Sequence, residues 1–600
     1  MKKIRFSTLI AALLTLSMLA AGCNNNNVPA DTTSGDTTPE VSGSTTASVE
    51  NTTAPTDDTT VPAAEPLSFV KDGKTDFVIV YRSGDDTVRT MAQQMANTFL
   101  NYSNVSIKLK SDAVGASEDH SSEHEILIGE TNRAESAEFM ADMAINQYGF
   151  GVRGNKLVIF GWNLTSLSSA IDSFTTYFKL NYSTKSQALE LAGDLVQLKK
   201  EYTWRVDIPA FTAGRLTGTT DCNDNNLLWY YTDTSLSDFE AYESTLAASG
   251  YERVYENSIT DNRFICYKSA AKDTVIYVSF SPCNGVTRLV SAPLSETNFV
   301  EDEEYTPITN IKVTQMILDY TGGKNIGMCY IVTLEDGSFL IYDSGGNVNG
   351  DFDRLYNLLN TLNERPDGKI VISAWLLTHE HWDHYANLYD FCCKYGSKVE
   401  VKYFLCNTPS YTSVMNSDEP HYFMAEKYQA ASQAVGGFKL VKLHTGEPVR
   451  LKGLELEVLY TQEDMYPDPI AKFNNTSMVT RIKAGGQTVM ILGDILKEGC
   501  KIMIDRFGDY LKSDIMQVAH HGYVAASVEF YKHVDPSVIL WPNSEEKAVQ
   551  LASASSTLSE YYQNYYLVNK LNVLEIFYAD GRNVTLSLPY TPNRGNEIYN

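Results

Sequence analysis

The residues best suited to chemistry lie close together at positions 379–384. The sequence there is His379-Glu380-His381-Trp382-Asp383-His384, which holds three of the ten histidines of the chain beside an aspartate. The apolar residues 370–377 come directly before it and predict a buried strand that ends at Thr378. Imidazole nitrogens and a carboxylate oxygen suit zinc, and also manganese or iron. We therefore expect divalent metal ions to bind on the loop after this strand.

Two later segments place the same kinds of side chain at strand ends. Residues 487–492, apolar from Val489 on, predict a strand that ends at Gly493 and Asp494. Residues 514–519 then lead into the pair His520 and His521. An isolated Gly-Asp pair would mean little by itself.

The spacing of His379, His381, Asp383 and His384 resembles the HxHxDH signature of the metallo-β-lactamase superfamily. This resemblance implies a C-terminal four-layer αβ/βα sandwich with two metal ions at one end. The implied first-site ligands are His379 and His381, the second-site ligands are Asp383, His384 and His521, and Asp494 bridges the two ions.

One departure from that pattern concerns the first site. Many members place a third histidine shortly before the bridging aspartate, but this chain has Asn474 and Asn475 there. The Asn-rich segment, the strand ending in Gly-Asp and the His-His-Gly sequence at 520–522 together resemble the branch containing the metallo-β-lactamase domain of DNA-uptake competence proteins. Bacterial phosphorylcholine esterases share the broader plan. We expect Asn474 or Asn475 near the first metal, and His421 and His444 in surface loops.

The resemblance also implies a reaction, in which a hydroxide activated by two divalent ions attacks an ester. Asp383 and His520 are the catalytic candidates, with His520 contacting the substrate or supplying a proton to the leaving group. We expect Asp343 to orient a ligand histidine, with a plain turn at the strand end as the alternative. We expect Trp382 and Tyr385 to pack against a helix that starts near residue 387, with contact to a choline or sugar group as the alternative. The expected metal is zinc, with manganese or iron as alternatives.

Three functions fit these residues. The first is hydrolysis of a phosphodiester on a cell-surface or glycan-linked substrate, which follows from the branch resemblance. The second is a β-lactamase or lactonase acting on an amide or ester, and the third is a non-catalytic glycan-binding lipoprotein. The net charge of −26 argues against nucleic acid as the partner, because binding a polyanion requires clustered lysine and arginine.

The first 65 residues predict export and anchoring. Lys2, Lys3 and Arg5 precede the apolar stretch 9–21, which is too short to span a bilayer, and small residues then lead to Cys23. This order resembles a lipoprotein signal, residues 1–23, whose cysteine carries a lipid; an ordinary signal peptide is the alternative. Residues 24–65 are rich in Thr, Ser and Asn and predict a disordered tether. We expect a protein anchored to the outer face of a bacterial membrane.

Three folded units follow: a small α/β domain at 66–204, a small α+β module at 205–302 and the hydrolase domain at 303–600. The first resembles an α/β domain of some glycan-active enzymes through residues 128–133 and 154–159. In the second, Ser237 and Glu240 predict a capping box for a helix that stops at Gly250. We expect unpaired cysteines beyond Cys23, with a Cys266–Cys283 bridge as the alternative. The oligomeric state is not predicted.

Overall fold

The computed structural model describes residues 65–143, 147–162, 164–200, 204–318, 327–346, 350–414, 417–419, 425–523, 526–553 and 572–600. The predicted signal peptide, Cys23, His421 and nearly all of the tether lie outside these ranges. Cysteines 222, 266, 283, 329, 392, 393, 406 and 500 are all free thiols, so the alternative of a Cys266–Cys283 bridge is wrong.

The N-terminal sheet has six strands in the order β3-β2-β4-β6-β5-β8, and β1 pairs with β7 in a separate ribbon. Strands β2, β3, β4 and β6 are parallel, and helices α1 and α3 bury one face of the sheet. Strands alternate with helices here, as is typical of an α/β domain. The elements are β1 (Leu67–Val70), β2 (Val78–Tyr81), α1 (Asp86–Ser103), β3 (Lys108–Ser111), β4 (Glu125–Ile128), α2 (Ala134–Ala141), β5 (Gln147–Arg153), β6 (Lys156–Gly161), α3 (Leu164–Asn181), β7 (Leu189–Leu191) and β8 (Val196–Lys200).

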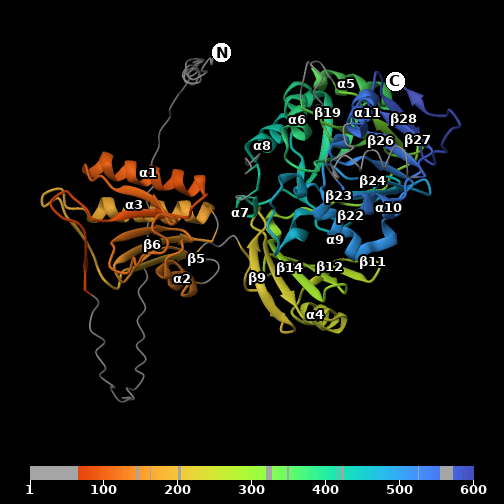
Figure 1. Ribbon diagram of the computed structural model, residues 1–600. Coiled ribbons are helices and arrows are strands. Elements are labelled where there is room, and N and C mark those ends of the chain that lie inside the picture. Colours follow the sequence, from red (N-terminus) through yellow and green to blue (C-terminus); the bar gives the residue numbers. More distant parts are fainter. Residues whose placement is uncertain are drawn as a thin grey trace, which may run out of the picture. The chain divides into compact units, whose positions relative to one another are not determined.

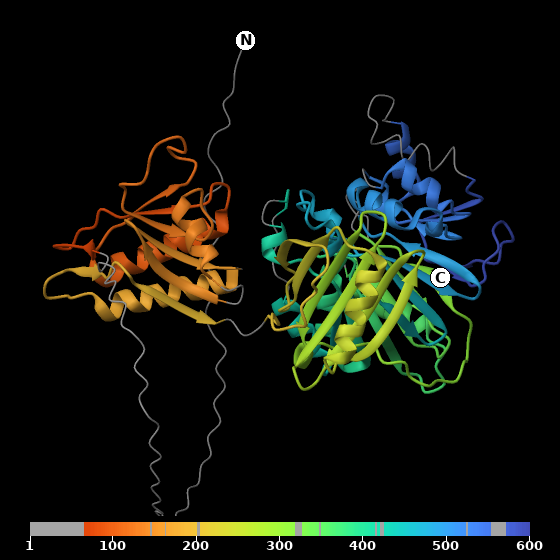
Figure 2. The same cartoon turned by 90° about the horizontal axis from the view of Figure 1, so that it is seen from below.

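The middle sheet is antiparallel, in the order β11-β12-β13-β14-β10-β9, and α4 lies across one face of it (Figure 2). Phe239, Tyr242 and Leu246 of α4 are buried against that face. The capping box of α4 is formed by Ser235 and Asp238, so the prediction of Ser237 and Glu240 is wrong by two residues. The elements are β9 (Arg215–Asp221), β10 (Leu227–Thr232), α4 (Leu236–Ala248), β11 (Glu252–Ile259), β12 (Asn262–Ser269), β13 (Thr274–Ser281) and β14 (Val286–Pro293).

Two larger sheets follow. The first has eight strands in the order β20-β19-β18-β17-β16-β15-β28-β29, and the second has seven in the order β21-β22-β23-β24-β25-β26-β27. The strands are β15 (Lys312–Gln315), β16 (Cys329–Thr333), β17 (Phe339–Asp343), β18 (Ile370–Leu376), β19 (Val399–Cys406), β20 (Lys439–Lys442), β21 (Pro448–Leu451), β22 (Leu454–Tyr460), β23 (Val479–Ala484), β24 (Gln487–Ile491), β25 (Ile515–Gln517), β26 (Val538–Trp541), β27 (Glu575–Tyr578), β28 (Val584–Ser587) and β29 (Ile598–Tyr599).

These two sheets pack face to face between helices, which makes four layers (Figure 1). Side chains alternate between the faces of a strand, so most of these strands contribute both to the central core and to the core beneath the helices. The expected αβ/βα sandwich is thereby confirmed. The helices are α5 (Asp351–Leu362), α6 (Trp382–Tyr395), α7 (Tyr411–Val414), α8 (Ala425–Ala434), α9 (Lys497–Phe507), α10 (Val528–Val534) and α11 (Glu545–Ser553).

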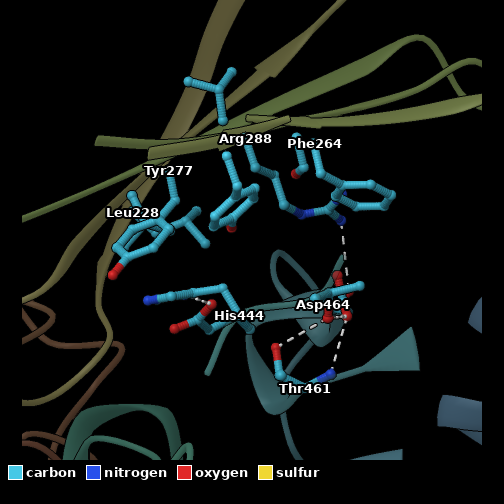
Figure 3. A pocket seen from close by; sticks show the side chains of 13 residues that line it. Leu228, Phe264, Tyr277, Arg288, His444, Thr461 and Asp464 are labelled. Atoms are coloured by element: carbon cyan, nitrogen blue, oxygen red, sulfur yellow. Dashed lines mark hydrogen bonds and ion pairs between the residues drawn. The ribbon is translucent and has the colours of Figure 1, made fainter. Parts of the chain in front are cut away.

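The middle sheet turns its other face toward the sandwich, and a cavity of about 30 Å³ remains between them (Figure 3). The ring of His444 lies against Tyr277 with centroids 3.9 Å apart, and its Nδ1 is 2.8 Å from Glu463 Oε2. His444 is therefore buried, and its expected place in a surface loop is wrong. Arg288 reaches from β14 to the backbone carbonyls of Asp464 and Tyr466. A cavity of this size admits about one water molecule.

Candidate metal centre

The predicted ligands stand at the carboxyl ends of parallel strands. Asp343 ends β17, and His379 follows β18, its parallel neighbour in the eight-stranded sheet. In the seven-stranded sheet, Asp494 follows β24 and the pair His520-His521 follows the parallel strand β25. Parallel strands end at a common edge, so each sheet gathers its polar side chains there. The two edges are joined where Met478 N donates to Thr378 O at 2.8 Å.

Helix α6 begins earlier than the sequence predicts. It starts at Trp382, with His381 as its N-cap, so Asp383 and His384 lie in its first turn rather than on a loop. A carboxylate in the first turn of a helix interacts favourably with the helix dipole. Both Trp382 and Tyr385 belong to this helix, so the expectation that they pack against it is wrong. Tyr385 is buried beneath α6, whereas Trp382 is 52% exposed.

His379, His381 and Asp494 form a first group, whose candidate ligand atoms all lie within 4.8 Å of one another. His379 Nε2 is 3.0 Å from His381 Nδ1 and 4.0 Å from Asp494 Oδ2. These three side chains come from both sheets, and two imidazoles with one carboxylate are a common donor set for zinc.

Asp383, His384 and His521 form a second group within the same limit. His521 Nε2 is 3.4 Å from Asp383 Oδ2, and His384 Nε2 is 4.0 Å from Asp383 Oδ1. Asp494 Oδ2 lies 3.2 Å from His384 Nε2 and 3.3 Å from His521 Nε2. Asp494 thus stands between the two groups, where a carboxylate can serve both.

Several buried polar atoms of these groups have no hydrogen-bond partner among the residues that the structure describes. They are Asp494 Oδ1, His381 Nε2, His384 Nε2 and both ring nitrogens of His521. Leaving such atoms unpaired in a protein interior costs free energy. Because His384 Nε2 and His521 Nε2 converge with the carboxylates of Asp383 and Asp494, a cation bound there would satisfy these two nitrogens. The residues present therefore fit divalent metal ions.

The local charges favour the same conclusion. Burial, followed by the neighbouring His384 and His381, holds the pKa of His379 well below its usual range. For His384, burial opposes protonation, but the carboxylates of Asp494, Asp343 and Asp383 outweigh it and raise its pKa. Burial likewise opposes the ionisation of Asp494, yet the nearby histidines lower its pKa well below the usual value. The carboxylates thus attract positive charge to the centre, and a bound cation would supply it.

Asp343 lies behind the second group. Its Oδ2 is 2.7 Å from His384 Nδ1, and its carboxylate also accepts hydrogen bonds from the backbone and hydroxyl of Thr378. Asp343 is fully buried and has a φ of 52°. Its contact leaves His384 Nε2 directed at Asp494, which is the arrangement expected of a residue that orients a ligand.

His520 and His521 adopt left-handed backbone conformations, with φ of 49° and 53°. Their side chains separate: His521 is buried in the second group, whereas the His520 side chain is 29% exposed and has its Nε2 3.9 Å from Asp494 Oδ2. Asn474 Nδ2 is 3.3 Å from His520 Nε2. The amide of Asn475 instead bonds Leu496 N and Glu498, so of the two asparagines Asn474 is the one beside the centre.

Some residues near the centre gave no signal in the sequence. Gly327 has a φ of 91°, and a Cβ at that position would lie 1.5 Å from Asp383 O, so only glycine fits. The ring of Phe473 lies 4.9 Å from that of His381. Glu419 Oε2 lies 3.1 Å from His381 Nε2. Such contacts arise from the tertiary fold, and no spacing pattern marks these residues.

Comparison with known proteins agrees with this geometry. Residues 322–541 match the model of the metallo-beta-lactamase superfamily. A segment of 105 residues is 30% identical to ComE operon protein 3 of Bacillus subtilis, which is 17% of this chain but only 13% of that protein.

Solved structures give weaker matches. The metallo-beta-lactamase fold protein YhfI of Bacillus subtilis matches with 14% identity and a TM-score of 0.28, over 46% of this chain and 99% of YhfI. CmlA of Streptomyces venezuelae, a diiron beta-hydroxylase, matches with 12% identity and a TM-score of 0.29, over 60% of this chain and 79% of CmlA. The superfamily match, the four-layer sandwich and the two ligand groups agree: the chain carries a domain of the metallo-β-lactamase superfamily within residues 322–541.

Proposed function

We propose that this protein is a metal-dependent hydrolase of phosphodiesters. The observation that carries the proposal is the position of Asp494, which belongs to the first ligand group and contacts two histidines of the second. A shared carboxylate is what two adjacent cation sites require. Divalent ions bound there would lower the pKa of water and polarise a phosphoryl oxygen.

The protein's own side chains would bind the ions and contact the substrate. His379 and His381 would hold the first ion, Asp383, His384 and His521 the second, and Asp494 both. We assign His520 to the substrate for two reasons. Its side chain is as exposed as that of Asp383 and more exposed than those of the other five residues of the centre. Its Nε2 also lies near Asp494, although His520 belongs to neither ligand group. A protonated His520 would donate its proton to the leaving oxygen.

Charge favours an anionic ester as the substrate. Two divalent ions carry four positive charges, whereas the ligand groups supply two carboxylates, Asp383 and Asp494. The centre would retain positive charge, which attracts a phosphodiester more strongly than a neutral lactone or amide. The exposed side chain of Trp382, directly before Asp383, offers an apolar surface to the substrate's organic part.

Purified protein with added zinc or manganese would be offered bis-p-nitrophenyl phosphate and nitrocefin in parallel. We expect turnover of the phosphodiester alone, and its loss in a His381→Ala, Asp383→Ala double variant. Turnover of nitrocefin alone would replace the proposal with a lactamase activity. No turnover of either ester by metal-loaded protein, together with glycan binding that the double variant retains, would favour a non-catalytic binding role.

We further propose that the protein works outside the cytoplasm, attached through a lipid on Cys23. The charged start, the short apolar stretch and the small residues before Cys23 support this location. In the part of the chain that the structure describes, no helix has the length and apolar character needed to cross a membrane. A surface location would bring the hydrolase to phosphodiesters of the cell envelope.

A further inference from the structure

Two of the candidate ligand histidines direct one ring nitrogen toward the centre and the other toward a carboxylate. For His384, Nε2 faces Asp494 and Nδ1 lies 2.7 Å from Asp343. For His381 the nitrogens are exchanged: Nδ1 lies 3.0 Å from His379 Nε2, and Nε2 lies 3.1 Å from Glu419 Oε2. The contact between His381 Nε2 and Glu419 has the distance of an ion pair, but the two groups are not aligned for a hydrogen bond.

Contacts of its neighbour Asp418 hold Glu419 in this place. Asp418 N donates to Ala471 O at 3.0 Å, and Asp418 Oδ1 accepts from Phe473 N at 2.9 Å. Lys472 Nζ lies 3.2 Å from Asp418 Oδ2. The segment 471–473 also carries the Phe473 ring that lies against His381, so one short stretch fixes both the carboxylate and one face of the imidazole.

We propose that Glu419 is the positioning residue of the first metal site, an inference that rests on the proposed metal-dependent function. Glu419 Oε2 lies 3.1 Å from His381 Nε2, so its negative charge would keep the ring proton on Nε2 and leave the Nδ1 lone pair for the first metal site. Carboxylates that fix the tautomer of a ligand histidine raise the affinity of the site for its metal. Glu419 thereby supports a site that lacks the third histidine found in many members of the superfamily.

The two supporting carboxylates differ in their surroundings. Asp343 is fully buried and also bonds Thr378, whereas the Glu419 side chain is 68% exposed. Water competes for an exposed carboxylate, and salt screens it. The first site should therefore bind its ion more weakly than the second, and its occupancy should depend more strongly on Glu419.

The test is a zinc titration of the full chain, in competition with a chromophoric chelator, for wild type and Glu419→Gln. We expect two zinc ions in the wild type and, in the variant, an affinity about 10–100-fold lower at the weaker site with the tighter site unchanged. Glu419→Asp should recover part of the loss. The control is Asp509→Asn, which removes another exposed carboxylate beside a histidine, His533, at 3.3 Å.

Two outcomes would overturn the inference. One is an unchanged affinity of both sites in Glu419→Gln, and the other is a wild type that binds fewer than two zinc ions. Thermal unfolding of the metal-free proteins checks that Glu419→Gln still folds. The Asp418→Asn variant should weaken the same metal site, because it weakens the contacts of Asp418 that hold Glu419 in place. Metal binding is measured without any ester, so a wild type that binds two ions but hydrolyses no phosphodiester would contradict the proposed function and not this inference.

Discussion

Asp494 Oδ2 lies 3.2 Å from His384 Nε2, although Asp494 follows a strand of the seven-stranded sheet and His384 belongs to the helix after a strand of the eight-stranded sheet. The contact exists only because the two sheets pack with these strand ends at the same edge. The Gly493 that precedes Asp494 has a φ of 54°, and a Cβ there would lie 3.0 Å from the Thr378 side chain. The close approach of the sheets thus depends on glycine at this position.

Replacing Asp494 by Asn should weaken both metal sites together. The amide keeps the size of the side chain but removes the charge that both groups share, so we expect zinc affinity and phosphodiester turnover to fall by more than about 100-fold. Metal content after dialysis and the rate with bis-p-nitrophenyl phosphate measure the effect. Asp505→Asn, which removes an exposed carboxylate paired with Lys501, should change neither quantity. Loss of only one ion would show that Asp494 does not bridge.

Replacing Asp343 by Asn should instead weaken the second site. The variant can no longer hold His384 through a charged acceptor at Nδ1, and we expect zinc affinity at that site to fall about 10–100-fold. Competition with a chelator, combined with the Glu419→Gln data, assigns each loss to one site. Equal losses at both sites in both variants would mean that the carboxylates act through overall stability.

The grouping of these side chains could be predicted from the sequence because strand ends and ligand spacing are local features. The strands before Thr378 and Asp494 were recognisable as apolar runs. They belong to different sheets, and the packing of the two sheets brings their ends together. Residues that act through contacts distant in sequence, such as Glu419 and Gly327, carried no such pattern.

The errors have the same origin. His444 looked like a loop residue because its burial depends on the middle sheet, which covers it with Tyr277. The start of α6 was placed too late because Trp382 to His384 have no strong helical signal of their own, whereas packing of the helix fixes its first turn. The N-cap of α4 was predicted two residues too late because serine is a good N-cap at both Ser235 and Ser237, and only the backbone geometry distinguishes the two positions.

Arg288 should stabilise the contact between the middle sheet and the sandwich. It is buried, its guanidinium lies 4.9 Å from the centre of the Tyr230 ring, and it donates to Tyr466 O at 3.2 Å. Arg288→Met removes these interactions, and we expect the free energy of unfolding to fall by about 1–3 kcal/mol. Denaturant titration measures it. Arg215→Met, which removes an exposed arginine, should change stability by less than about 0.5 kcal/mol.

Cys23 should determine where the protein is found in cells. If this thiol carries a lipid, Cys23→Ala abolishes attachment because no lipid can be added, and the protein moves from the membrane fraction to the soluble fraction or remains unprocessed. Fractionation with metabolic labelling by a fatty-acid analogue measures this. Cys283→Ala, which removes an exposed thiol of the middle sheet, should leave both distribution and labelling unchanged. Labelling that persists in Cys23→Ala would refute the anchor.

Acid should weaken the N-terminal sheet through Glu125. Burial disfavours its ionisation, but hydrogen bonds from Arg133 and Lys110 and the charge of Lys156 outweigh burial and lower its pKa to about 2. Because the folded-state pKa lies below the ordinary 4.5, the stabilisation is complete above pH 4.5 and disappears as the pH falls toward 2.

This stabilisation is on the order of 2 kcal/mol, and Glu125→Gln should remove it. We expect the difference in unfolding free energy between wild type and Glu125→Gln to be large at pH 6 and to shrink between pH 4.5 and pH 2.5, as followed by denaturant titration. Glu130→Gln removes an exposed partner of Arg82 and should leave this pH dependence intact, because solvent screens that pair. A difference that stays constant down to pH 2.5 would show that Glu125 acts through packing and not through its charge.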